Sequence, residues 1–91
     1  MGNAITLRGA EATVTWSYHT AAVCRSWQAT KAGQGRWALV ASLTRADPFK
    51  LRQAPLLFNV PRKGGYWSWR VETITHCDAQ QLRATLGPME A

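Results

Sequence analysis

Residues Arg36–Thr44 read RWALVASLT and residues Tyr66–Thr75 read YWSWRVETIT, and these two stretches decide the predicted fold. Apolar side chains occupy every second position of both, namely Trp37, Leu39, Ala41 and Leu43 in the first and Trp67, Trp69 and Val71 in the second. The intervening positions of the second stretch are Tyr66, Ser68, Arg70 and Glu72. Because successive side chains of a β-strand point to opposite faces of a sheet, both stretches predict strands with one buried face.

Shorter runs of β-branched and aromatic residues are spaced along the rest of the chain, with turn residues between them. Further strands are expected from Ala4 to near Gly9 and over Thr13–Tyr18, Ala22–Lys31, Leu56–Val60 and Gln81–Leu86. In the second of these, Val14, Trp16 and Tyr18 would share one face. A helix is an alternative for Ala22–Lys31, whose residues have acceptable helix propensity. We prefer a strand, because the compact turn Ala32–Gly35 would join it to Arg36–Thr44 as a hairpin.

A short helix is predicted near 48–53. Asp47 can accept hydrogen bonds from the exposed N–H groups of a first helical turn, and Pro48 is tolerated at the first helical position. Pro55 would stop this helix. Pro61–Gly65 is expected to be a turn, and Gly87-Pro88 is expected to end the last strand, leaving residues 87–91 as a loose tail.

The chain has 91 residues, and we expect them to form a single domain over 1–91. Short connections and regular turn spacing predict a mainly β fold, a small antiparallel β-barrel or sandwich of about six strands with one short helix. So small a domain buries little surface, so large aromatic side chains matter most. We expect Trp16, Trp37, Trp67 and Trp69 in the core and leave Trp27 open, since Arg25 shares its face.

The balance of charge favours an acidic partner. Eleven Lys and Arg residues face five Asp and Glu, for a net charge of +6, which suits nucleic acid or an acidic protein. An alternative is that most of the basic residues form a solvated face. We find no apolar run long enough to span a membrane and no secretory signal in the first residues. A cytoplasmic location is therefore expected.

Catalytic and metal-binding patterns are not apparent. His19, His76, Cys24 and Cys77 match a zinc ligand count, but the spacing is unsuitable because His76 and Cys77 would point to opposite faces of a strand. The five acidic residues are scattered. We therefore predict no catalytic residue, no metal, no cofactor and no enzyme activity, with a His-based nuclease as an open alternative. The two cysteines are expected to be free thiols, although a Cys24–Cys77 disulfide stays open.

Basic residues concentrate around the predicted helix and the turn that follows the next strand. They are Arg45, Lys50, Arg52, Arg62 and Lys63. If the helix packs beside the Pro61–Gly65 turn, these charges gather at one end of the barrel, and Tyr66 and Arg70 extend the patch along a strand. Lys and Arg follow phosphates while bases stack on aromatic rings, so this pattern suits single-stranded nucleic acid. The stacking candidates are Tyr18, Tyr66 and any tryptophan that is exposed.

The C-terminal half resembles small uncharacterised proteins of bacteriophages and prophages. The resemblance lies in Arg45–Phe49, Pro55–Arg62 and Gly65–Trp69, which read RADPF, PLLFNVPR and GYWSW. It implies an origin rather than an activity. Phage proteins of this size are virion components, nucleic-acid binders or inhibitors of host systems. We thus predict a non-enzymatic basic module that binds nucleic acid or a nucleoprotein complex. The alternatives are an anti-CRISPR-like inhibitor and a tail or head component, for which a homo-oligomer is expected.

Overall fold

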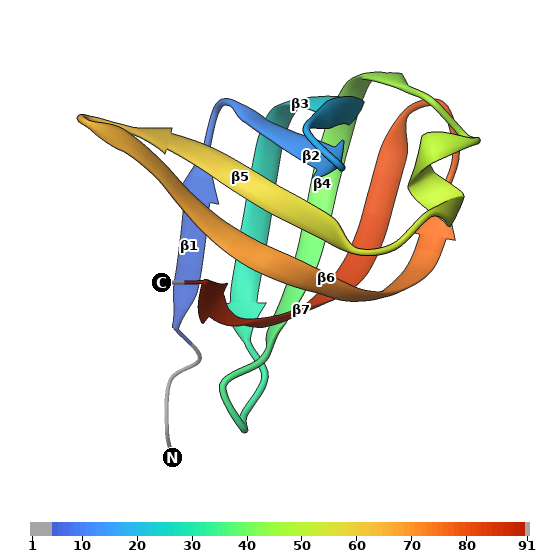
Figure 1. Cartoon of the computed structure of the whole chain (residues 1–91). Coiled ribbons are helices and arrows are strands. Elements are labelled where there is room, and N and C mark those ends of the chain that lie inside the picture. Colours follow the sequence, from blue (N-terminus) through green and yellow to red (C-terminus); the bar gives the residue numbers. More distant parts are fainter. Residues whose placement is uncertain (1–4, 91) are drawn as a thin grey trace.

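The computed structural model describes residues 5–90, which form a small β-barrel (Figure 1). Within this range the elements are β1 (Thr6–Gly9), β2 (Ala12–Trp16), β3 (His19–Lys31), β4 (Trp37–Ala46), the 3-10 turn η1 (Lys50–Arg52), β5 (Leu56–Arg62), β6 (Gly65–Cys77) and β7 (Gln81–Glu90). The predicted class, an antiparallel barrel with one short helix, is confirmed. Residues 1–4, where no signal sequence is expected, and Ala91 lie outside the described part of the chain.

Six strands close the barrel in the order β3-β2-β5-β6-β7-β4, and β4 pairs back with β3. β1 stands outside this ring and pairs with the second half of β3, where Gly9 lies opposite Trp27. β2 pairs with the first half of β3, where Ala12 lies opposite Cys24. The two short strands thus follow one edge of β3. A Cβ atom on Gly9 would lie 2.5 Å from Nε1 of Trp27, so this strand end needs glycine for the indole to pack against it.

Phe58 of β5 lies at the centre of the core and is fully buried. Its ring meets Trp27 edge-on at a centroid distance of 5.4 Å and lies 6.1 Å from Trp69. Side chains from the other barrel strands complete the interior, chiefly Val14, Cys24, Leu39, Leu43, Leu82 and Leu86. The predicted inner face of β4 is confirmed, and Trp37 packs half-buried against the core.

Trp27 belongs to the core, a placement that the alternation of β3 does not predict. The pairing of β3 with β4 shifts register between Cys24 and Ser26. Such a bulge moves the following side chains to the other face of a strand. Arg25 therefore stays outside, where its guanidinium donates a hydrogen bond to the carbonyl oxygen of Leu43 at 2.8 Å, while Trp27 turns inward.

Two of the expected placements on aromatic residues are wrong. Trp67 is 41% exposed rather than buried, because β6 extends beyond the barrel at that point. Tyr18 does not lie on the inner face of β2. It forms the tight turn to β3 with Ser17, both with positive φ angles (67° and 50°), and is fully exposed. Trp16 packs against the edge of the core as expected.

Several segment ends also differ from expectation, since β3 begins at His19 rather than Ala22 and β5 continues to Arg62, into the expected Pro61–Gly65 turn. Asp47 begins the helical turn as predicted: its Oδ1 accepts hydrogen bonds from the N–H groups of Phe49 (3.0 Å) and Lys50 (3.2 Å). The expected end of the last strand at Gly87-Pro88 is wrong, because β7 continues to Glu90, opposite Ser68 of β6. Residues 87–90 are thus paired rather than loose.

Candidate binding surfaces

The five basic residues that were expected to gather at one end of the barrel fall into two groups. Arg45, Lys50 and Arg52 lie at the η1 end of the barrel, whereas Arg62 and Lys63 lie at the tip of the β5–β6 hairpin. β5 runs seven residues from the η1 end to this tip, which is a distance of about 20 Å. Figure 1 shows η1 and the hairpin tip on opposite sides of the molecule. The expectation that these charges gather at one end is therefore wrong.

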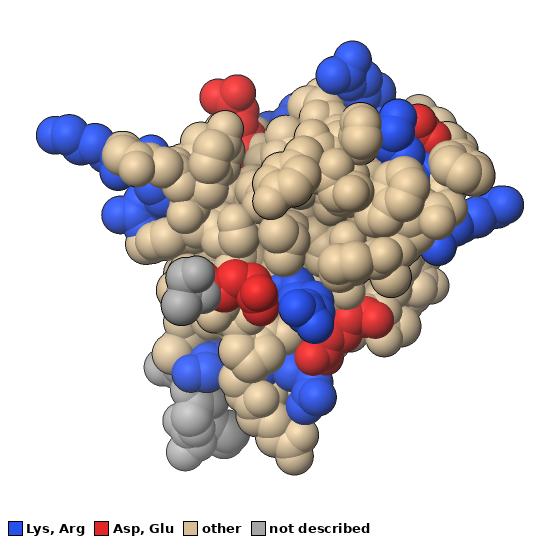
Figure 2. All heavy atoms as spheres, in the orientation of Figure 1, with Lys and Arg blue, Asp and Glu red and all other residues tan. Residues whose placement is uncertain are grey.

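The tip of the hairpin stands clear of the barrel. β2 pairs with β5 only as far as Asn59, and β7 pairs with β6 only from Ser68. Residues Val60–Trp67, which we call the β5–β6 arm, thus extend beyond both neighbouring strands in the described chain. Blue side chains mark the end of this projection in Figure 2. No acidic residue occurs between Leu56 and Val71, so the sequence of the arm carries only positive charge.

One face of the arm carries a stacked pair. The guanidinium carbon of Arg62 lies 3.4 Å from the centroid of the Trp67 ring. Trp67 in turn meets Trp69 edge-on, with a centroid distance of 6.3 Å and an interplanar angle of 84°. Arg62 covers one face of the Trp67 ring. A ligand that approaches from this side therefore meets the plane of the Arg62 guanidinium, which can also stack on a base.

The opposite face of the arm carries Tyr66, whose side chain is 67% exposed. Its ring forms no aromatic pair with any residue among 5–90. Ser68 and Arg70 follow on the same face. Nη2 of Arg70 lies 3.9 Å from Oε1 of Glu90, and both side chains are exposed, so this ion pair is weak. Tyr66 is therefore a free stacking surface with a cation further along its strand.

A groove of about 620 Å³ opens at the η1 end of the barrel. Its walls come from the end of β4, from the η1 segment and from the β6–β7 turn. They are Thr44, Arg45, Ala46, Pro48, Leu51, Arg52, Ile74, Cys77, Asp78 and Ala79, and we call this feature the β4–η1 groove. Most of its wall residues are apolar, with two arginines among them. Arg45 also lines a smaller neighbouring hollow of about 280 Å³ that includes Lys50.

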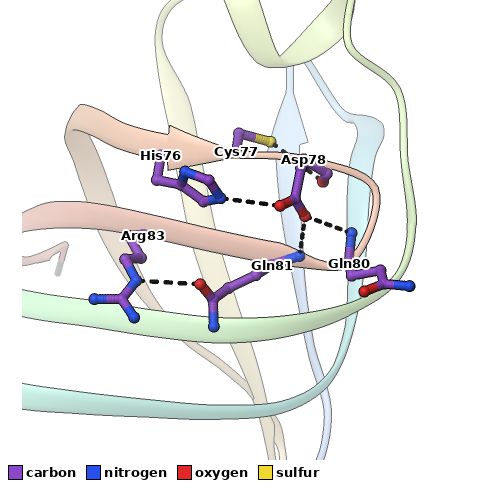
Figure 3. A network of polar contacts seen from close by, with 6 residues as sticks. All are labelled: His76, Cys77, Asp78, Gln80, Gln81 and Arg83. Atoms are coloured by element: carbon purple, nitrogen blue, oxygen red, sulfur yellow. Dashed lines mark hydrogen bonds and ion pairs between the residues drawn. The ribbon is translucent and has the colours of Figure 1, made fainter.

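The β6–β7 turn, which lines part of this groove, is held by a network of polar contacts (Figure 3). Oδ1 of Asp78 accepts hydrogen bonds from the N–H groups of Gln80 and Gln81, each at 2.8 Å, and Oδ2 lies 3.0 Å from Nε2 of His76. These bonds to the backbone and to His76 hold the pKa of Asp78 below its usual value of 3.8. Both oxygens of this carboxylate are thus occupied within the turn.

The other carboxylate near the groove, that of Asp47, is also bound by a neighbouring residue. Asp47 forms an ion pair with Lys50 at 3.0 Å, and hydrogen bonds from Lys50 lower the pKa of this carboxyl. Cys77 is exposed at the groove wall, whereas Cys24 is buried on the inner face of β3, and the two thiols are not bonded to each other. Over residues 5–90, no group of three or more His, Cys, Asp or Glu side chains is arranged to hold a metal ion.

The chain matches no protein-family model, no curated protein and no solved structure. The surfaces themselves therefore carry the functional argument. In the part of the chain that the structure describes, no helix has the length and apolar character needed to cross a membrane.

The β4–η1 groove was not foreseen in the sequence. Its apolar residues, such as Leu51 and Ile74, come from segments about twenty positions apart and belong to no motif. Cys77 and Asp78 look like an ordinary hairpin end in the sequence. The pairing of β4 with β7 stops at Ser42, and the groove lies beyond this point. Its position therefore depends on strand register. Arg45 and Arg52 belong to the residues predicted to bind nucleic acid or an acidic partner, but the sequence predicts no groove beside them.

Proposed function

We propose that the protein is a non-enzymatic module that binds single-stranded nucleic acid on the β5–β6 arm. The observation that carries the proposal is Tyr66, a largely exposed ring without an aromatic partner in the described chain, on an arm whose two charged residues are both basic. A net charge of +6 adds a long-range attraction for polyanions.

The two faces of the arm would act together on one strand. Bases stack on the Tyr66 ring and on the Arg62 guanidinium, because stacking tolerates any base. Lys63 at the tip contacts phosphate as a flexible point charge. Arg70 lies four residues from Tyr66 on the same face, about 13 Å along β6, and extends the track of positive charge. Such a site has little preference for sequence and a strong dependence on salt.

The two exposed tyrosines allow a matched test. Fluorescence anisotropy is measured with a labelled oligothymidine and with the variants Tyr66→Ala and Tyr18→Ala. Base stacking on one aromatic ring contributes about 1–3 kcal/mol, so we expect Tyr66→Ala to weaken binding by about tenfold or more. Tyr18 is even more exposed than Tyr66 but lies in the β2–β3 turn, away from the arm. Equal losses in the two variants, or none in either, refute the assignment to the arm.

A second candidate, a virion component that assembles into homo-oligomers, is favoured by the open strand edges. β1 is paired on one edge only within residues 5–90, and the arm has no neighbouring strand on either side. Unpaired edges can pair with another copy of the chain. Light scattering at increasing protein concentration tests this candidate, which requires a defined multimer and fails if the protein stays monomeric.

Inhibition of a host nucleoprotein, the remaining alternative, would use the same arm on a nucleic acid already bound to protein. It predicts that the protein competes with a host complex for an oligonucleotide. The Tyr66→Ala variant should then lose this competition together with its own binding.

A further inference from the structure

We propose that the β4–η1 groove is a second binding site, which takes an extended acidic peptide of a partner protein with an apolar side chain seated among Pro48, Leu51 and Ile74. This site lies at the end of the barrel opposite the arm and does not depend on nucleic-acid binding. Three features of the groove lead to this ligand: its charge, its strand edge and its lining.

The charge of the groove favours carboxylates. Arg45 and Arg52 form no ion pair or side-chain hydrogen bond with any residue among 5–90. The nearby acids do not neutralise them, because Asp47 is bound to Lys50 and both oxygens of Asp78 are used within its turn. Two arginines are thus available at the walls of an apolar groove, and planar guanidinium groups pair well with carboxylates.

The backbone at one wall favours an extended chain. β4 pairs with β7 only as far as Ser42, and the last bond between them runs from the N–H of Leu43 to the carbonyl oxygen of Gln80. Beyond it, Arg45 and Ala46 are paired only with β3 in the described structure, and Thr44 lies at a shift in that register. An added peptide strand can hydrogen-bond to such a free edge. Its side chains then alternate, apolar ones toward the groove and acidic ones toward the arginines at its rim.

The lining favours a peptide over nucleic acid. None of the groove-lining residues is aromatic, so no ring is placed for a base to stack on. Aliphatic contacts from Leu51 and Ile74 instead suit a leucine-like side chain. The volume of about 620 Å³ falls within the usual size of a ligand site.

The probe for this site is a capped hexapeptide of alternating aspartate and leucine, labelled for anisotropy. We compare wild type with Arg45→Glu/Arg52→Glu and with a charge-matched control, Arg8→Glu/Lys31→Glu, whose residues are exposed and belong to neither surface. We expect the groove variant to weaken binding by about tenfold or more and the control by less than about threefold. Peptides of alternating lysine and leucine, or aspartate and serine, should bind at least about tenfold more weakly. Equal losses in both variants, or no saturable binding, overturn the proposal.

A second measurement on wild-type protein needs no variant. Cys77 is the exposed thiol and lies in the groove wall, whereas Cys24 is buried. A bound peptide should therefore slow alkylation of Cys77 by iodoacetamide by about fivefold or more at saturation. Oligothymidine bound at the arm should leave this rate unchanged. Peptide binding without protection of Cys77 overturns the proposal, and so does equal protection by oligothymidine, which would place nucleic acid in the groove.

Discussion

The guanidinium carbon of Arg62 lies 3.4 Å above the centre of the Trp67 ring, at the point where the β5–β6 hairpin leaves the barrel. Trp67 contacts Trp69 edge-on, and Trp69 contacts the buried ring of Phe58. A continuous line of aromatic side chains thus connects the core with the cation near the tip. We infer that this line stiffens the β5–β6 arm, which has no neighbouring strand in the described chain, and that it fixes the orientation of the Arg62 plane.

The contribution of this pair to stability can be measured with a double-mutant cycle of Arg62→Ala and Trp67→Ala. An exposed cation–π pair contributes about 0.5–1 kcal/mol, so the coupling energy should fall in that range. The measurement is the free energy of unfolding in urea for the four proteins. A coupling energy of zero would mean that the stack contributes nothing to the folded arm in solution.

Phe58→Ala should be among the most destabilising single substitutions in the chain. The ring is fully buried and contacts both Trp27 and Trp69, so its removal leaves a cavity that costs about 3–5 kcal/mol. Phe49→Ala is the matched control, because this ring is 67% exposed and its loss should cost less than about 1 kcal/mol. Comparable losses in the two urea titrations would contradict the position of Phe58 at the centre of the core.

The strands were readable because their alternation is local. Leu39, Ala41 and Leu43 face inward as their spacing predicts. The errors arise where a local feature interrupts that alternation. The bulge between Cys24 and Ser26 reverses the faces of β3, and the residue types there carry no bulge signal. Ser17 and Tyr18 form a two-residue turn without glycine. Both lie in the left-handed region of φ, which few residues other than glycine adopt.

The two cysteines should differ sharply in reactivity. Burial raises the pKa of Cys24 to about 11, and its thiol has no access to solvent. Partial burial and the carboxylate of Asp78 also raise the pKa of Cys77, but this thiol is exposed. Since the thiolate is the reactive form, iodoacetamide should label Cys77 alone and slowly near neutral pH, and Asp78→Asn should accelerate that labelling. Mass spectrometry counts the adducts. Rapid double labelling of the folded protein would contradict the buried position of Cys24.

Acid should weaken the β6–β7 turn through Asp78. Its pKa is lower in the folded chain than its usual value of 3.8, so the unfolded chain binds a proton more readily. The stability that the carboxylate adds is complete above that value and is lost as the pH falls through the folded pKa. The difference in urea midpoint between wild type and Asp78→Asn should therefore shrink from about pH 6 to about pH 2.5. Gln80→Ala, an uncharged change in the same turn, is the control, and a difference that shrinks equally there would contradict this role.

The cations predicted to bind a partner do not form the single patch that was expected. Lys50 and Arg62 are twelve positions apart, and their separation in space depends on the direction of β5. That strand leads away from η1 and places Arg62 at the far end of the hairpin. Trp67 is exposed although the alternation of its strand predicts the core. The reason is that the length by which a hairpin extends beyond its neighbouring strands depends on strand register. The β4–η1 groove depends on register in the same way.

The salt dependence of oligothymidine affinity shows whether the arm binds single-stranded nucleic acid through its cations. Each phosphate contact on a single strand contributes a slope of about −0.7 in a plot of log affinity against log salt. We predict a steep slope for wild type and a slope shallower by about 0.7 for Lys63→Ala, which removes the phosphate contact, with Lys31→Ala unchanged. An affinity that does not vary with salt, or equal slopes in all three proteins, would contradict the claim.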